Sequence, residues 1–356
     1  MAISQLSLTD FRNLASTTLD FHPRLNLVTG QNGSGKTSLL EAIYVLCQAC
    51  SFRTHQLKQC IRHDKSSLLL FGRSHNYRAG LSKSDKKLEI HLDGEPIKRR
   101  SELVRKSPVL ILNADSFLLI SGSPQLRRQF IDWCLFHVEH AYADDWLLFK
   151  HALKQRNRLL KTKQDLRQLP YWDQHLLEPS MRLSRLRSHY CEQLNSLMSE
   201  QTSGILENLS ITLEYQQGWP QSEKLEDSLE KYRARDIKAG FTSCGIHRDD
   251  LRILSRGRPV METLSRGQSK RLCLALILSA LKLVNEKAPG QIILLIDDLH
   301  SELDESAQSM VYDQLDNMDL QLFISNIDES VPKPVAAKEF KMFHVEHGMI
   351  KPRKFS

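Results

Sequence analysis

The 356-residue sequence is 41% hydrophobic and 26% charged with a net charge of +7, which is typical of a globular chain of two or three domains. Its most apolar stretch, residues 272–284, is interrupted by Lys282 and is shorter than the ~20 residues of a membrane span, and the N-terminus lacks the pattern of a signal peptide. The seven scattered cysteines are an odd number, which argues against a disulfide framework and predicts reduced thiols in a cytoplasmic protein with no membrane partner.

The N-terminal region predicts strands, a glycine-rich loop and a helix in succession. Residues 1–24 alternate as strands, residues 25–28 read as a further strand, and apolar residues between 39 and 46 recur at helical spacing. A full match to the phosphate-binding pattern G-x-x-x-x-G-K-[ST] lies between them. Its backbone N–H groups would face phosphate oxygens, Lys36 would reach the β- and γ-phosphates, and Thr37 would coordinate Mg²⁺. We expect ATP to bind Gly30, Gln31, Asn32, Gly33, Ser34, Gly35, Lys36 and Thr37.

The middle of the sequence predicts short strands and then long helices. Residues 66–113 alternate in short apolar runs, and Asp93-Gly94 supplies a hairpin turn signal between them. From about Leu126 the pattern becomes helical, and apolar residues recur at sevens on both sides of Pro170. Two helices joined by a short loop would form an antiparallel arm. A repeat this short also fits helices that pack on the core.

The predicted arm carries the basic excess of the chain. Residues 150–190 contain ten Lys or Arg and three Asp or Glu, a net charge of +7 that equals the charge of the whole sequence. This excess predicts a surface for a polyanion such as DNA, and Arg156, Arg158, Lys161 and Lys163 are cations expected to contribute to binding. An ordinary solvated helical face is the alternative.

A second nucleotide-related motif follows the buried strand expected at residues 292–296. Asp297 and Asp298 end this strand, as in a Walker B element, and Asp297 would hold Mg²⁺. Asp298 lies where a general base would polarise the attacking water, so Asp298 and Lys36 are the expected catalytic residues. Related ATPases usually have Glu at this position, and the shorter Asp predicts slow hydrolysis.

A third motif, Leu264–Arg271, resembles the signature of ABC-type ATPases, in which a helix N-terminus caps the γ-phosphate bound to a second subunit. The motif residues expected to contact nucleotide are Ser265, Gly267 and Gln268. Residues 301–304 resemble the D-loop of the same family, and Ser325 or Asn326 takes the place of its switch histidine. We therefore expect an α/β fold: an ABC-type P-loop ATPase head, with a mixed β-sheet and flanking helices, that carries the inserted antiparallel helical arm.

The separation of 229 positions from Lys36 to Ser265 is much longer than in a transporter subunit and is typical of the SMC-like DNA-repair branch. Several further segments resemble the RecF family: Phe11-Arg12-Asn13, Leu40-Glu41-Ala42-Ile43, Ser51-Phe52-Arg53, Gly122-Ser123-Pro124 with Arg127-Arg128 and Asp132, and Gly245-Ile246-His247-Arg248-Asp249-Asp250. The resemblance covers nearly the whole chain. Ile246 replaces a usual Pro, and Asn113-Ala114-Asp115 departs from Pro-Glu-Asp, so no Q-loop contact is assigned. His247-Arg248-Asp249-Asp250 fits either a structural network or a nucleotide or DNA contact.

The resemblance implies an ATP-dependent homodimer that binds DNA at single-strand gaps or junctions, with RecR and RecO as partners, and helps to load RecA. A weak DNA-dependent ATPase activity is expected with it. Residues 1–125 and 206–356 would form the two parts of the head, and residues 126–205 the arm. Two alternatives are a DNA-binding scaffold that uses ATP only as a dimerisation switch and a transport-coupling ATPase.

Overall fold

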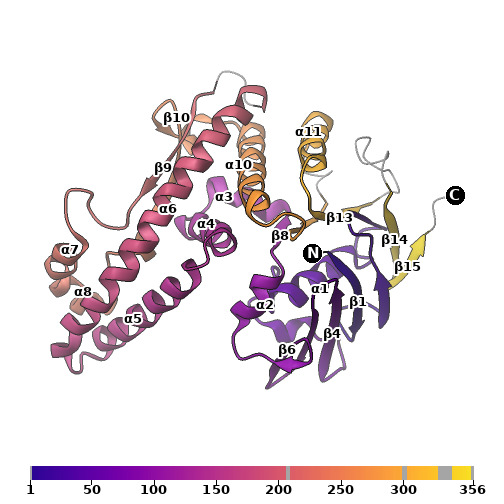
Figure 1. Ribbon diagram of the computed structural model, residues 1–356, viewed down its shortest axis with the longest axis horizontal. Coiled ribbons are helices and arrows are strands. Elements are labelled where there is room, and N and C mark those ends of the chain that lie inside the picture. Colours follow the sequence, from indigo (N-terminus) through magenta and orange to yellow (C-terminus); the bar gives the residue numbers. More distant parts are fainter. Residues whose placement is uncertain (1, 206–208, 299–302, 328–338, 354–356) are drawn as a thin grey trace. The chain divides into compact units, whose positions relative to one another are not determined.

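The computed structural model describes residues 2–205, 209–298, 303–327 and 339–353, with side chains described outside 199–205. Contacts divide the chain into two compact units (Figure 1). The first comprises Met1–Ser116 and Val284–Ser356, and the second comprises Phe117–Leu283. The domain boundaries expected from the sequence, at 125/126 and 205/206, were based on motifs rather than on contacts, and they stay a prediction. Among the described residues, no helix is both long and apolar enough to cross a membrane.

The first unit contains a mixed six-stranded sheet in the order β15-β14-β3-β13-β12-β8. All neighbouring strands in it are parallel except β15, which is antiparallel to β14. The strands are β3 (Leu25–Thr29), β8 (Val109–Leu112), β12 (Ile293–Ile296), β13 (Gln321–Asn326), β14 (Lys341–Glu346) and β15 (Met349–Arg353). Because β3 and β12 run in the same direction, the loops that follow them lie at the same edge of the sheet.

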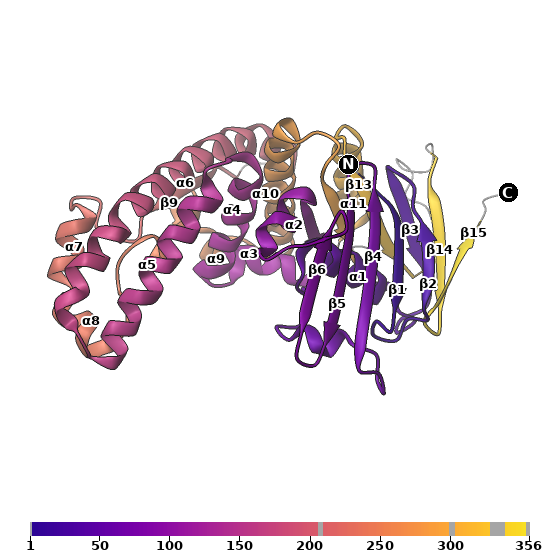
Figure 2. The same cartoon turned by 60° about the horizontal axis from the view of Figure 1, so that its bottom comes forward.

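The second sheet of this unit is antiparallel, in the order β2-β1-β4-β5-β6-β7, and Figure 2 shows β6, β5, β4 and β1 side by side. Its strands are β1 (Ile3–Thr9), β2 (Thr17–Asp20), β4 (Ser67–Ser74), β5 (Arg78–Ser84), β6 (Leu88–Leu92) and β7 (Glu95–Pro96). Asp93 and Gly94 have φ of 54° and 96° and connect β6 to β7, which confirms the predicted turn.

Helix α1 (Lys36–Gln48) contacts both sheets, β4 and β5 of one and β8 and β13 of the other. Eleven of its 13 residues are buried, so the helix is covered on nearly every side. The other helices of this unit are α2 (Arg100–Lys106) and α11 (Glu305–Asp316). The position of α1 fixes the phosphate-binding loop before it on a rigid support.

The second unit is mostly helical. Its helices are α3 (Leu118–Ser121), α4 (Pro124–Val138), α5 (Tyr142–Thr162), α6 (Leu169–Ile205), α7 (Leu225–Lys231), α8 (Arg233–Ala239), α9 (Val260–Thr263) and most of α10 (Arg266–Lys287). A three-stranded sheet contains β9 (Ile211–Gln216), β10 (Asp250–Ser255) and β11 (Arg258–Pro259). Arg256 and Gly257, both with positive φ, make the tight turn between β10 and β11.

Helices α5 and α6 form the antiparallel pair predicted from the heptad pattern. Arg156 of α5 pairs with Asp173 of α6, and Asp145 of α5 pairs with Arg182 of α6, so residue numbers rise along one helix as they fall along the other. Pro170 is the second residue of α6, where its missing N–H costs no helical hydrogen bond. Helix α6 also contacts β9 and α7 within the same unit. These contacts agree with the alternative interpretation, in which the helices pack on a core.

Candidate functional site

The predicted phosphate-binding loop connects the end of β3 to the start of α1 at Lys36. Gly35 is the N-cap of α1 and has a φ of +121°, which favours glycine. At Gly30, an added Cβ would lie 2.2 Å from the backbone oxygen of Val345. The loop therefore needs glycine at both positions to keep its curled backbone at the helix N-terminus, where the N–H groups favour an anion.

Lys36 lies against its own loop. Its Nζ donates to the backbone oxygens of Gly30 at 2.7 Å and Gln31 at 3.1 Å, and the side chain is buried. Burial lowers the pKa of Lys36, while the charges of Asp298 and Asp297 act in the opposite direction. The ammonium group is thus held over the loop, between the bend of the backbone and the two carboxylates.

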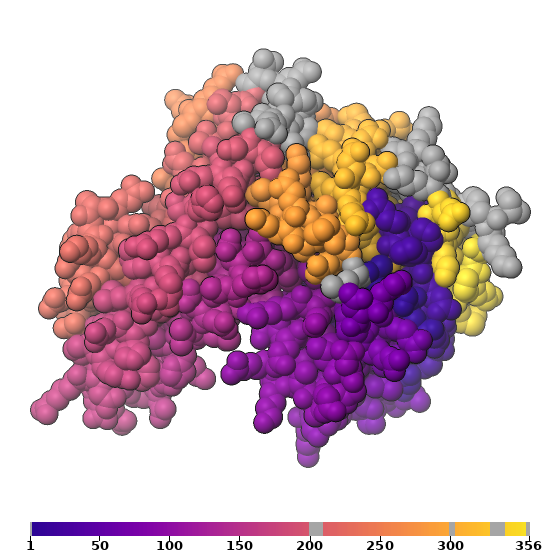
Figure 3. All heavy atoms as spheres, viewed as in Figure 1, coloured from indigo at the N-terminus to yellow at the C-terminus, as the bar shows by residue number. Residues whose placement is uncertain are grey.

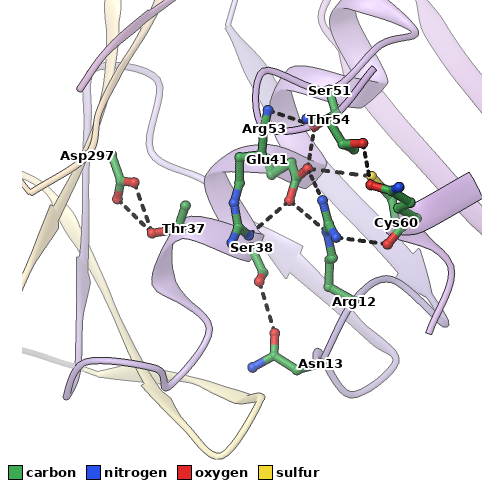
Figure 4. Close-up of polar contacts among 11 residues, drawn as sticks. Arg12, Asn13, Thr37, Ser38, Glu41, Ser51, Arg53, Thr54, Cys60 and Asp297 are labelled. Atoms are coloured by element: carbon green, nitrogen blue, oxygen red, sulfur yellow. Dashed lines mark hydrogen bonds and ion pairs between the residues drawn. The ribbon is translucent and has the colours of Figure 1, made fainter. Parts of the chain in front are cut away.

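Asp297 and Asp298 follow β12, as the Walker B prediction requires. The Oγ1 of Thr37 donates to both carboxylate oxygens of Asp297, at 2.9 and 3.1 Å (Figure 4). This pair offers a hydroxyl and a carboxylate, which are the hard oxygen ligands that Mg²⁺ prefers. The donor set therefore fits Mg²⁺, with Thr37 and Asp297 as its protein ligands.

Ser325 connects the two acidic residues to the neighbouring strand β13. Its Oγ donates to Oδ1 of Asp297 at 2.7 Å and accepts the backbone N–H of Asp298 at 2.9 Å. Asp298 has a φ of +52°, so this hydrogen bond supports a left-handed backbone at a residue with a Cβ. Ser325 is one of the two residues, with Asn326, expected in place of the switch histidine, and it contacts the carboxylate that is expected to hold Mg²⁺.

We expect Ser325→Ala to reduce the gain in ATP affinity that Mg²⁺ provides by up to about tenfold, because one net hydrogen bond is worth about 0.5–1.5 kcal/mol. ATP affinity without Mg²⁺ should not change. Titration calorimetry with and without Mg²⁺ measures both values, and Ser67→Ala, an exposed serine in β4, is the matched control. Equal weakening in both conditions would contradict a role at Asp297.

A buried carboxylate, Glu41 on α1, collects hydrogen bonds from three separate segments (Figure 4). Arg12 donates to its Oε1 at 2.7 Å and to its Oε2 at 3.0 Å, and Arg53 donates to Oε2 at 3.3 Å. The Ser51 hydroxyl and the Cys60 thiol also donate to it. Burial acts to raise the pKa of Glu41, but the bonds from Arg12 and Ser51 outweigh it and leave the pKa below its usual range.

This network was missed as a functional unit at the level of sequence. Arg12, Glu41 and Arg53 lie in three segments that resemble the RecF family, and that shared resemblance was the signal that could have linked them. Arg12 and Arg53 also line a cleft of about 950 Å³ together with the phosphate loop, Asp297 and Asp298. Glu41 therefore holds two cations at the wall of the candidate nucleotide cleft.

The signature residues belong to the second unit, at the start of α10. The backbone N–H of Ser265 donates to Oε1 of Gln268 at 2.9 Å, and the N–H of Gln268 donates to Oγ of Ser265 at 3.3 Å. This reciprocal pair is a capping box. Ser265, Gly267 and Gln268 are all exposed, so the helix N-terminus is accessible to an anion.

Two further segments come from the sequence comparison with known motifs: the expected D-loop and Asn113-Ala114-Asp115. Ser301 and Glu302 of the expected D-loop lie outside the described residues, and Asp304 caps α11 by accepting the N–H of Ala307 at 2.9 Å. Asn113 makes a local turn in which its side chain accepts the N–H of Ser116. The role of Asn113-Ala114-Asp115 therefore stays unassigned.

In the His247–Asp250 segment, the two carboxylates take part in a structural network. Asp249 is buried and accepts from Arg187 and from the hydroxyl of Tyr215, while Asp250 accepts two bonds from Arg127. This arrangement matches the structural alternative for these two residues. Arg248 is exposed and lies over the ring of Phe241.

The prediction that Arg156 is a surface cation that contributes to DNA binding is wrong. Arg156 is fully buried and donates to Asp173 at 2.5 Å, to Asp236 at 2.8 Å and to Thr242 at 2.8 Å. It points inward because it lies on the face of α5 that packs on α6 and α8. Arg158, Lys161 and Lys163 are exposed, as expected.

The loop between β3 and α1, the acidic residues after β12 and the helix start at Ser265 define the class of this protein: an SMC/ABC-like ATPase head. The structure resembles that of an Smc head bound to the C-winged helix domain of ScpA, with a TM-score of 0.62 at 15% identity, over 100% of this chain and 98% of the other. This likeness concerns the fold.

The particular family follows from closer comparisons. The model of the RecF/RecN/SMC N-terminal domain matches residues 2–351. Two relatives named DNA replication and repair protein RecF, from Shewanella denitrificans and Idiomarina loihiensis, are 36% and 39% identical, each over 98% of this chain and 99% of the relative. A solved structure of the recombination mediator protein RecF-ATP in the RecFOR pathway has a TM-score of 0.88 at 26% identity, over 99% and 98% of the two chains. The chain belongs to the RecF family.

Proposed function

We propose that this protein is an ATP-dependent DNA-binding protein of recombinational repair and replication-fork maintenance. It dimerises on ATP and acts at single-strand gaps to help load RecA, with RecR and RecO as partners. ATP binding is supported by one observation: Lys36 lies against the loop that follows β3, and Thr37 of the same loop is hydrogen-bonded to Asp297, which follows β12. The names of the relatives support the repair part. A cytoplasmic location stays a prediction.

In this proposal, the residues of the loop bind and orient ATP. Backbone N–H groups of the octapeptide and the Lys36 ammonium hold the phosphates. Mg²⁺, when bound, neutralises charge that develops on the phosphate oxygens. Thr37 and Asp297 hold that ion, and Ser325 orients Asp297 through the 2.7 Å hydrogen bond. Asp298 is the proposed general base.

Dimerisation is the part of the proposal that rests on Ser265. We expect ATP to convert the protein from monomer to dimer, because the exposed capping box of one copy would bind the γ-phosphate held by another. Ser265→Arg should prevent the dimer without loss of ATP binding, and Lys36→Arg should weaken both. Sedimentation velocity with and without ATP measures this. A wild-type protein that stays monomeric with saturating ATP would overturn the proposal that ATP is bound between two copies.

A scaffold in which ATP is only a switch is a second candidate, and the shorter Asp298 with its φ of +52° favours it. If Asp298 is a working base, Asp298→Asn should lower DNA-stimulated turnover by roughly 100-fold or more, within the range of general-base catalysis. ATP affinity should be retained. Steady-state phosphate release measures turnover, and equal rates for the two proteins would favour the scaffold. The family assignment replaces the transport-coupling alternative.

A further inference from the structure

An exposed aromatic cluster lies on the outer face of the α5–α6 pair, in the second unit. Its members are His151 of α5 and Tyr171, Trp172 and His175 of α6. The rings of Tyr171 and His175 are tilted by 36° with centroids 4.1 Å apart, and Trp172 contacts both His175 at 5.8 Å and His151 at 5.6 Å. Tyr171 is 56% exposed, and both histidines are exposed. The cluster therefore presents ring surface to solvent.

A stripe of cations runs along α5 on the side of the helix that carries His151, a member of this cluster. Lys154, Arg158 and Lys161 follow His151 at spacings of three and four residues, so all four lie on one side of the helix. Each is exposed, and within the described part of the chain none of the three cations is ion-paired. The pairing of Arg156 with Asp173 sets the register of the two helices. In that register Lys154 and Arg158 lie level with His175 and Tyr171.

Of the acidic groups near this stripe, Asp165 is exposed four residues after Lys161, and the others are paired with other cations. Glu178 and Asp145 are both paired with Arg182, and Asp173 is buried with Arg156 and Arg233. Parts of α5 and α6 form the surface of the second unit at the lower left of the space-filling view (Figure 3). The face thus combines accessible rings with unneutralised cations at a spacing set by two rigid helices.

We propose that this face binds single-stranded DNA, with unpaired bases stacked on Tyr171 and His175 and phosphates contacting Lys154, Arg158 and Lys161. Flat rings accept any base, whereas the bases of a duplex are stacked on one another and present no free face. Cations without rings would bind duplex and single strand through phosphates alone. The inference rests on the proposed function, since it specifies how a DNA-binding protein of this kind would recognise the unpaired side of a gap.

The test compares three ligands with the full-length protein in ATP and Mg²⁺: an oligothymidylate, an abasic strand of the same length, and a duplex. Fluorescence anisotropy of the labelled DNA gives each affinity. Tyr171→Ala should weaken oligothymidylate binding roughly fivefold or more, with Tyr171→Phe restoring it, and should leave the abasic strand and the duplex unchanged. Phe241→Ala, which removes another exposed ring of the same unit, is the matched control and should change none of them.

A combined Lys154→Gln and Arg158→Gln variant should weaken binding of the oligothymidylate and the abasic strand alike and should lower the salt dependence of both. If Tyr171→Ala weakens the binding of all three ligands, or of none, the proposed stacking of bases on this face is wrong. The aromatic cluster would then be assigned to a contact with another protein. If wild-type protein binds duplex but not oligothymidylate, this inference fails alone. If it binds no DNA at all, the proposed function fails with it.

Discussion

Replacing Lys36 with alanine is expected to weaken ATP binding by roughly 10- to 150-fold, because a charge-assisted hydrogen bond to phosphate is worth about 1.5–3 kcal/mol. Lys36 is buried, and its Nζ is held within 3.1 Å of the loop carbonyls of Gly30 and Gln31. The charge is therefore placed over the loop before any ligand arrives, and no other described lysine side chain has this position in the cleft. Titration calorimetry with ATP measures the loss.

Two further measurements separate the loss of a phosphate contact from a damaged loop. Lys58→Ala removes an exposed lysine of the same unit and should bind ATP as tightly as the wild type. The unfolding midpoint of Lys36→Ala should fall only modestly, since two bonds are removed, one to the buried backbone oxygen of Gly30 and one to the backbone oxygen of the exposed Gln31. An ATP affinity within twofold of the wild type would show that Lys36 does not contact phosphate.

The second large effect is expected from Glu41→Gln, which should destabilise the protein by roughly 3–5 kcal/mol, the range for removing one partner of a buried ion pair. Glu41 is fully buried and is the shared acceptor for Arg12 and Arg53, so the neutral amide leaves both cations without their counter-charge. Urea unfolding measures the change. Glu95→Gln, at an exposed position in β7, should stay within about 0.5 kcal/mol of wild type.

The effect of Glu41 should depend on pH in a defined direction. Its pKa in the folded protein lies below the unfolded value of about 4.3, so its stabilisation is complete above that value. As the pH falls through the lower folded pKa, the carboxylate gains a proton and the stabilisation is lost. The difference between wild type and Glu41→Gln should therefore be constant near neutral pH and shrink below about pH 4. A difference that grows on acidification would contradict this assignment.

The local sequence was sufficient to predict the position of a motif wherever its functional residues lie within a few consecutive positions. The octapeptide at Gly30, the acidic pair after 292–296 and the helix start at Ser265 each fall where the sequence predicts. In each of these, a short pattern fixes the backbone: glycines curl the loop, apolar residues bury the strand, and Ser265 with Gln268 caps the helix.

The direction in which each side chain points from α5 could not be predicted from the sequence, so the charged surface was predicted less accurately than the short motifs. Arg156 and Arg158 are two residues apart, about 200° around α5, and have equal weight in any count of basic residues. Arg156 is fully buried against Asp173 and Asp236, whereas Arg158 is exposed. The partners come from α6 and α8, so only the packing of three helices decides which cation faces solvent.

Long-range contacts decided the rest of the site. The sequence by itself determined that a phosphate-binding-loop motif, an acidic pair of the Walker B type and an SMC-like signature occur in this chain, because each motif consists of adjacent residues. That Ser325 holds Asp297, and that Arg12 and Arg53 share Glu41, depends on segments far apart in the chain meeting at one sheet edge and one helix. Such contacts are set by strand order and by the burial of α1 between two sheets, which only the tertiary structure determines.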